Sequence, residues 1–386
     1  MAPPAPPFPV ADPRETRSGV LPPPSSVSRR DLFRFRSPGR ASEPNTPAPS
    51  PALERVNGGD LVLARRPGMG SYFEVRLPVR TPGAAALAQS ALDVIDAVEF
   101  LLTIYRDDSE VSRLNASAHE GPVRVSPELF SLIERALQIG RQTDGAYDLA
   151  SGALSLAWGF IRGPKRVPSP DDLADARDRS GSHLIQLDPE QSTVQFSRPG
   201  VVLNFGAIGK GYALDRVAQL IRDYWFPTSA LVHGGQSSLF ALGSPPDRLG
   251  GRWQIRVVDP FDLSRSVGTL HLRNRGLSTS GGSIQWFEAN GCFYSHILDP
   301  RIGEPLDADA PASVTVLAPT AAEADALSTA FSILGPDGSA AILRDRTDIA
   351  ALFILRGEDG RSRTVTFNLS DHDFSPESLE GATAPP

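Results

Sequence analysis

Cysteine is almost absent from this chain of 386 residues. Cys292 is the single cysteine, so an intramolecular disulfide is impossible and a cysteine-ligated zinc or iron–sulfur site is excluded. The six histidines lie too far apart in the sequence to form the short-spaced pairs of many zinc sites. A metal ion bound by this chain is therefore expected to have oxygen ligands.

An excess of positive charge and a long apolar run are also missing. The chain has 38 basic and 45 acidic residues, a net charge of −7, which argues against a protein held to nucleic acid by a broad basic face. No run of about 18 apolar residues occurs, the length that a membrane-spanning helix needs. The sequence therefore predicts neither a nucleic-acid partner nor a membrane span.

The two ends of the chain differ in composition from its centre. Residues 1–55 are rich in proline and lack apolar periodicity, so we predict a disordered leader, and residues 371–386 are predicted to be a flexible tail. The segment 28–33 resembles the start of a twin-arginine export signal, but a polar, proline-rich stretch follows where such a signal needs an apolar one. We expect a cytoplasmic protein, with export through this degenerate leader as the minor alternative.

Residues 56–370 show the hydrophobic patterns of one folded domain. Strand patterns occur in consecutive groups, beginning at 61–64 and 72–77, with a further hairpin at 184–187 and 193–196 and a strand at 201–205. Helical periodicity covers 84–105, 127–143, 212–225, 321–334 and 336–344. Grouped strands without strict alternation of strand and helix favour an α+β fold with antiparallel sheets and packed helices.

The segment 204–212 carries the sequence Asn-Phe-Gly-Ala-Ile-Gly-Lys-Gly-Tyr between a predicted strand and a predicted helix. Small residues let backbone groups approach a ligand, a helix start offers unpaired N–H groups to an anion, and Lys210 adds a positive charge. Among the 38 basic residues only Lys165 and Lys210 are lysine. The segment therefore suits a phosphate, although an ordinary glycine-rich turn before a helix would look similar.

A second segment, residues 324–329, places Asp325 and Thr329 four residues apart on one helix face. A carboxylate and a hydroxyl that meet carbonyl and phosphate oxygens suit Mg²⁺ or Ca²⁺. The alternative is an acidic residue that is simply favoured at a helix N-terminus.

A third segment, residues 294–305, contains His296 on an alternating pattern that ends in a Pro/Gly turn. This placement suits an acid–base group at a sheet end, and a structural histidine is the alternative. The Gly-rich stretches 233–237 and 278–282 are interpreted as turns that either line the same cleft or have no role.

Taken together and in this order, eight segments resemble the ApbE-type FAD:protein FMN transferases, and the resemblance spans about residues 60–357. Each segment alone is common, but their joint order is specific. The segments are residues 69–71, 108–115, 144–148 with 158–160, 206–215, 234–235, 278–281, 295–305 and 325–329.

The resemblance implies a Mg²⁺-dependent enzyme that transfers the FMN half of FAD to a Ser or Thr hydroxyl of an acceptor protein and releases AMP. By position, the carbonyl of Ala207 and the side chains of Asp325 and Thr329 would bind the metal. Lys210, Asp325 and His296 would take part in catalysis, with His296 as the candidate for handling the acceptor's proton. The positions implied to line the FAD site are Met69, Ala146, Tyr147, Asp148, Asn204, Lys210, His296 and Ile297.

The fold implied by the resemblance is α+β and T-fold-like, with the nucleotide in a cleft between two lobes that interleave in sequence. Asn204 stands where the family usually has Asp, and Ala150 and Ala153 replace the usual Thr and Pro. An amide in place of a carboxylate changes which hydrogen bonds the nucleotide can receive. Two other functions stay open at this point: an FAD pyrophosphatase that yields FMN and AMP, and a non-catalytic flavin-binding protein.

Overall fold

The computed structural model describes residues 54–56, 60–224, 229–248, 250–281, 286–307 and 309–377. Within these ranges the main feature is a nine-stranded sheet in which every neighbouring pair is antiparallel. Its strands, in spatial order, are β1 (Glu54–Val56), β2 (Leu61–Gly68), β3 (Ser71–Pro78), β7 (Ala230–Gly234), β8 (Ser238–Leu242), β11 (Arg275–Ser280), β16 (Ser313–Ala318), β17 (Ala350–Arg356) and β18 (Ser362–Phe367).

Four small sheets accompany it. They are β19 (Phe374–Pro376) with β10 (Asp262–Leu272) and β9 (Trp253–Asp259); β4 (Val123–Arg124) with β6 (Thr193–Phe196) and β5 (Ile185–Asp188); the hairpin β12 (Trp286–Ala289) and β13 (Cys292–Ser295); and β14 (Leu298–Asp299) with β15 (Glu304–Pro305). The α-helices are α1 (Ala84–Leu102), α2 (Glu110–Ser117), α3 (Pro127–Gln142), α4 (Gly152–Ala157), α5 (Pro170–Asp178), α6 (Gly209–Asp223) and α7 (Ala321–Asp345).

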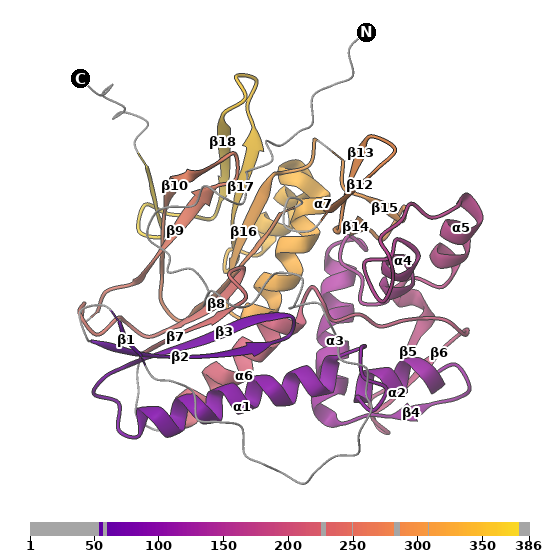
Figure 1. Ribbon diagram of the computed structural model, residues 1–386, viewed down its shortest axis with the longest axis horizontal. Coiled ribbons are helices and arrows are strands. Elements are labelled where there is room, and N and C mark those ends of the chain that lie inside the picture. The colour runs from indigo at the N-terminus through magenta and orange to yellow at the C-terminus, as the bar shows by residue number, and fades with distance from the viewer. Residues whose placement is uncertain are drawn as a thin grey trace.

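Both faces of the large sheet are buried, and alternate residues of one strand belong to different cores. On β8, Phe240 packs in the core with the helices, whereas Leu239 and Ala241 pack in the core with β9, β10 and β19. Figure 1 shows α1, α6 and α7 on one side of the sheet and the β9–β10 ribbon on the other. A central strand that is covered on both faces is expected to be apolar at successive positions, as β8 and β17 are.

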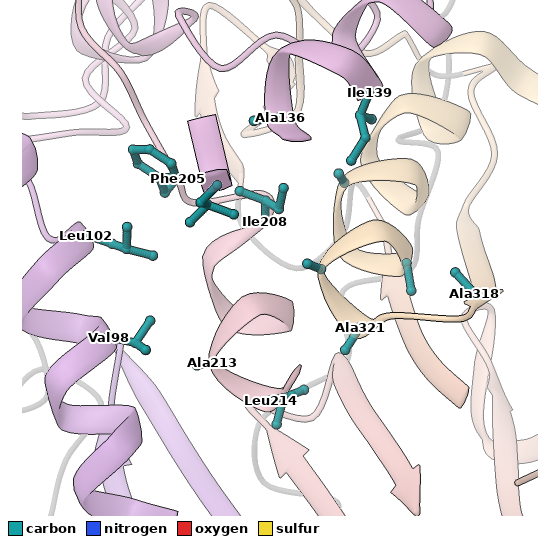
Figure 2. Close-up of a cluster of buried hydrophobic side chains, with 14 of the residues drawn as sticks. Val98, Leu102, Ala136, Ile139, Phe205, Ile208, Ala213, Leu214, Ala318 and Ala321 are labelled. Carbon is teal, nitrogen blue, oxygen red and sulfur yellow. The ribbon is translucent and has the colours of Figure 1, made fainter. Parts of the chain in front are cut away.

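The segment before α6 is fixed by side chains that enter the helical core. Phe205 and Ile208 are almost fully buried, while Gly206 and Ala207 between them remain accessible. Figure 2 shows Phe205 and Ile208 among side chains from α1, α3, α6 and α7, the last represented by Ala321. Two buried anchors on either side of a small-residue turn therefore set where the backbone of 206–207 lies.

The start of α7 is held against α6 and α3. Asp215 of α6 accepts hydrogen bonds from the backbone N–H groups of Ala321 (2.7 Å) and Ala322 (2.9 Å), and so caps α7 from another helix. Glu323, only 1% exposed, pairs with Arg135 at 2.8 Å and with Arg346 at 2.9 Å. The first turn of α7 is thereby oriented before any ligand binds.

Most of the elements expected from the sequence are present. The four predicted helices at 84–105, 127–143, 321–334 and 336–344 correspond to α1, α3 and the two parts of α7, which Gly335 interrupts with φ 66°. The predicted hairpin of strands at 184–187 and 193–196 is confirmed as β5 and β6. The predicted helix 212–225 begins earlier, at Gly209. The prediction of an α+β fold with antiparallel sheets is confirmed.

The predicted strand at 201–205 is wrong, because no strand forms there. The backbone of Leu203 pairs with a side chain instead: Asn115 Oδ1 accepts its N–H at 2.9 Å, and Asn115 Nδ2 donates to its carbonyl at 3.1 Å. The N–H of Asn204 donates to the Leu149 carbonyl at 2.9 Å. An extended apolar run thus finds its hydrogen bonds outside a sheet, which periodicity does not reveal.

Two predicted boundaries also need correction. The leader was predicted to end at residue 55, but Glu54 and Arg55 pair with β2 as part of β1. The tail was predicted to begin at 371, but Phe374–Pro376 pairs with β10 as β19. Residues 1–53 and 378–386, which hold most of the predicted leader and tail, lie outside the described residues. None of the described helices has the length and apolar character needed to span a membrane.

The close approach of α6 and α7 predicts the effect of one substitution. A Cβ on Gly211 would lie 2.1 Å from the carbonyl oxygen of Ala321, so Gly211→Ala forces the helices apart. We expect a loss of about 1–3 kcal/mol in the free energy of unfolding, measured by denaturant titration. Gly121→Ala, where no atom lies within 4 Å of the new Cβ, is the control. Equal stability of the two variants would contradict the close packing.

Asp215 predicts a dependence of stability on pH. Burial raises its pKa from the ordinary 3.8 to about 7, so between these values the folded protein holds a proton that the unfolded chain has lost. Stability therefore falls as the pH rises through this window. We expect the free energy of unfolding of the wild type, relative to Asp215→Asn, to decrease from pH 4 to pH 7. A difference that stays constant across this range would refute the raised pKa.

Candidate functional site

Asp325 is the centre of a polar cluster between α7 and the large sheet. Its side chain is 3% exposed. The Oδ1 atom accepts hydrogen bonds from the hydroxyls of Ser238 (3.2 Å) and Ser278 (2.9 Å), and Oδ2 accepts one from the N–H of Gly211 (3.1 Å). A carboxylate this deeply buried is stable only with such partners, and it receives them from β8, β11 and α6.

Lys210 brings a positive charge to this carboxylate. It lies in the first turn of α6, and its Nζ is 3.5 Å from Asp325 Oδ1. The same Nζ donates to the carbonyl of Gly206 at 3.4 Å. The two segments that the sequence analysis singled out, 204–212 and 324–329, therefore meet at one place. Neither segment by itself predicted this contact.

The turn at 204–208 presents the carbonyl of Gly206 to Lys210. Asn204 Oδ1 accepts the N–H of Gly206 at 3.0 Å, which closes a local turn. Ala207, the predicted carbonyl ligand, follows Gly206 and is partly exposed between two buried anchors. Asn204 thus makes the turn-forming bond that an aspartate would also make at this position.

Thr329 lies one helical turn after Asp325. Its hydroxyl donates to the Asp325 carbonyl at 3.4 Å and lies 3.3 Å from the hydroxyl of Ser280, which is 2.8 Å from that of Ser328. Asp325 and Thr329 therefore present oxygen atoms from the same face of α7, as the spacing predicted.

The residues at this cluster fit a hard divalent cation. The described part of the chain contains no group of three or more His, Cys, Asp or Glu side chains that could hold a metal. Mg²⁺ does not need such a group, because it is often bound by one or two carboxylates together with substrate phosphates. The ammonium of Lys210 lies between the oxygens of Gly206 and Asp325, so the cluster is an environment of oxygen atoms that attracts positive charge.

Tyr147 has a buried hydroxyl that could donate a hydrogen bond to a bound molecule. The residue is 3% exposed, and its hydroxyl has no hydrogen-bond partner among the described residues. Burial, together with the negative charges of Asp148 and Asp325, raises the pKa of Tyr147, so the hydroxyl keeps its proton. An orphaned donor close to the cluster is suited to an acceptor atom of a bound molecule.

Asp148 bonds to the loop that follows it and to Ser182. Its carboxylate accepts hydrogen bonds from the N–H of Ala150 (2.7 Å) and from the N–H and hydroxyl of Ser182 (both 2.8 Å). The side chain therefore fixes the loop that carries Ala146 and Tyr147. Whether it also contacts FAD stays a prediction.

Met69, His296 and Ile297 lie in segments that join strands. Met69 occupies the turn between β2 and β3 with φ 49°, and its Cε lies 3.2 Å from the point where Gly209, the first residue of α6, would carry a Cβ. Ile297 is buried and donates its N–H to Ser295 at 3.1 Å. His296 is half-buried between β13 and β14, and its proposed contact with the acceptor hydroxyl stays a prediction.

The serines that meet α7 were not among the site residues predicted from the sequence. Residues 278–282 were interpreted as a Gly-rich turn, but Ser278 and Ser280 lie within β11. The signal available in the sequence was their spacing of two residues, which is the period of a strand. Ser238 gave no comparable signal, because its place opposite Ser278 follows from strand pairing.

Known proteins are similar to this chain in sequence and in fold. The profile of the ApbE family matches residues 69–353. The chain is 33% identical over 302 residues to the FAD:protein FMN transferase of Treponema pallidum, covering 74% of this chain and 82% of that protein. It is 30% identical over 323 residues to the enzyme of the same name from Salmonella typhimurium, covering 82% and 88%.

Solved structures agree with the sequence comparisons. The crystal structure of the ApbE protein from Thermotoga maritima superposes with a TM-score of 0.70 at 27% identity, covering 78% of this chain and 96% of that one. The apo flavinyl transferase ApbE of Pseudomonas stutzeri gives a TM-score of 0.69 at 31% identity, covering 79% and 94%. The prediction of an enzyme of the transferase class is confirmed, and the chain belongs to the ApbE family.

Proposed function

We propose that this chain is a Mg²⁺-dependent FAD:protein FMN transferase, which attaches FMN through a phosphoester bond to a Ser or Thr of an acceptor protein and releases AMP. The observation that carries the proposal is the convergence of Lys210 and Asp325, whose Nζ and Oδ1 lie 3.5 Å apart at the adjoining ends of α6 and α7. When a pyrophosphate is cleaved, negative charge builds up on its bridging and leaving oxygens, and positive groups next to these oxygens stabilise it. Relatives with this fold carry the name of the reaction.

The metal would be held by the carbonyl of Ala207, the carboxylate of Asp325 and the hydroxyl of Thr329. When bound, Mg²⁺ would supply positive charge that neutralises the phosphate oxygens. All three donors are oxygens, which Mg²⁺ prefers. The support is that the structure brings Asp325, Thr329 and the turn at 206–207 to one cluster.

The chain's own residues would bind and orient the nucleotide. Lys210 would pair with the phosphates, whereas the N–H groups of Gly209 and Gly211 at the start of α6 already bond to the Phe205 carbonyl and to Asp325. The protonated hydroxyl of Tyr147 would donate to a ligand oxygen. The residues that we propose to line the rest of the FAD site are Met69, Ala146, Asp148, Asn204, His296 and Ile297.

In the transfer step the acceptor's hydroxyl oxygen forms a bond to the phosphorus of the FMN half. The bond between that phosphorus and the bridging oxygen breaks, and AMP leaves with the bridging oxygen. The hydroxyl proton must go to a base, for which we propose the imidazole of His296. Alignment of the hydroxyl with the phosphorus supplies much of the remaining acceleration.

An assay of AMP release tests the proposal. The chain is incubated with FAD and Mg²⁺, with and without a peptide that carries an Asp-initiated acceptor motif ending in Ala-Thr, and the peptide is weighed by mass spectrometry. We expect AMP only with the peptide, matched by an FMN adduct on its Ser or Thr. Chelation of Mg²⁺ and the variant Asp325→Ala should each abolish both products.

Other results would point to other functions. AMP and free FMN in the absence of peptide would mean that water takes the phosphoryl group and that the chain is an FAD pyrophosphatase. FAD that binds tightly but stays intact would mean a non-catalytic flavin-binding protein. Either result would refute the transferase.

Lys210 gives a second prediction with a matched control. Lys210→Met removes the ammonium next to Asp325, and loss of one such charge-stabilising group typically lowers kcat by about 10²–10³. Lys165→Met is the control, because this other lysine is exposed and donates to the Trp286 carbonyl at 3.1 Å. Steady-state AMP release compares the two. Equal rates would show that Lys210 does not act in the reaction.

A further inference from the structure

One face of β11 follows the first two turns of α7. Gly276 approaches the helix so closely that a Cβ on it would lie 2.4 Å from the Cα of Ala321. Two residues further along the strand, the hydroxyl of Ser278 contacts Asp325 at 2.9 Å. After two more residues, the hydroxyl of Ser280 contacts Thr329 at 3.3 Å.

This register has a simple geometric basis. Two residues of a strand advance about 6.7 Å and keep the same face, while four residues of a helix advance about 6 Å and also keep the same face. Positions 276, 278 and 280 can therefore match positions 321, 325 and 329 step by step. The two side chains proposed to bind the metal, Asp325 and Thr329, are both contacted by this strand, and Ser280 also lies 2.8 Å from the hydroxyl of Ser328.

Ser278 acts on Asp325 together with a serine of the next strand. Ser238 and Ser278 are paired in the register of β8 and β11, both are 0% exposed, and their hydroxyl oxygens lie 3.0 Å apart. The two serines have one hydroxyl proton each, but three contacts could use one: Ser238 to Asp325 Oδ1, Ser278 to Asp325 Oδ1, and the contact between the serines. The shortest of these is the one from Ser278, which makes Ser278 the principal donor to Oδ1.

The second carboxylate oxygen of Asp325, Oδ2, accepts fewer hydrogen bonds than Oδ1. A carboxylate can accept at about four lone-pair positions. Both serines and Lys210 lie at Oδ1, whereas Oδ2 receives the N–H of Gly211. Hydrogen bonds to Oδ1 fix the rotation of the carboxylate and leave acceptor capacity at Oδ2 for a cation.

We propose that Ser278 and Ser280 are positioning residues, which hold Asp325 and Thr329 in the orientation that binds the divalent cation. The inference rests on the proposed function, because the cation is part of it. Neither serine is proposed to touch the metal or the substrate. Partners that orient metal ligands in this way typically contribute about 10- to 100-fold to metal affinity.

Binding of Mn²⁺ tests this proposal without relying on turnover. The full chain is titrated with Mn²⁺ while the electron paramagnetic resonance signal of the free ion is recorded, both without nucleotide and with FAD but no acceptor. We expect Ser278→Ala and Ser280→Ala each to raise the Mn²⁺ dissociation constant about tenfold. Ser280→Thr keeps the hydroxyl at a partly exposed position and should restore the wild-type affinity.

Controls separate positioning from loss of folding. Ser339→Ala removes another buried α7 hydroxyl, which donates to the Gly335 carbonyl at 2.7 Å, away from Asp325. It should leave Mn²⁺ affinity unchanged. Thermal unfolding of every variant is measured beside the titration. In AMP-release assays the serine variants should need more Mg²⁺ for half-maximal rate but reach nearly the wild-type kcat.

The outcomes also distinguish this inference from the function on which it rests. Wild-type Mn²⁺ binding that is lost in Asp325→Ala but unchanged in both serine variants would overturn the positioning role alone. If Ser339→Ala weakened Mn²⁺ binding as much as the serine variants of β11 do, the positioning role would also be overturned, because the effect would then come from general packing. A wild-type chain that binds no Mn²⁺ with or without FAD would overturn the metal site itself.

Discussion

The rest of the site depends on a buried negative charge. Asp325 is held away from water between α6, α7 and the sheet, and such a group is stable only when donors and a cation reach it. The N–H of Gly211, the hydroxyls of Ser238 and Ser278, and the ammonium of Lys210 meet this need. Each of these contacts requires a specific approach of one element to another.

The core supplies those approaches. Gly211 lets α6 touch the start of α7, and Asp215 then caps α7 from the same helix. Because the large sheet is covered on both faces, its strands cannot shift without exposing one of two cores. The position of Ser278 relative to Asp325 is therefore determined by packing far from the cluster. The turn at residues 204–208, with Phe205 and Ile208 buried in the helical core, is in this way joined to a rigid frame.

Local patterns predicted the helices well, because amphipathic stripes such as those of α1 and α3 depend on nearby residues. They misled at residues 201–205, where the side chain of Asn115 replaces a neighbouring strand, and at residues 278–280, where a small-residue segment proved to be a central strand. In both cases the deciding partner lies far away in the sequence. Asp148 likewise has its bonds to Ser182, which no motif indicated.

The sequence by itself determined which chemistry the chain can carry. One cysteine and scattered histidines make an oxygen-bound metal the expected kind, and Lys210, Asp325 and Thr329 were predicted as site residues from their spacing and from the family resemblance. Only the tertiary structure decided how these groups are held. Ser238 and Gly211 meet Asp325 across separations of 87 and 114 residues, and such contacts follow from strand register and helix packing rather than from any local pattern.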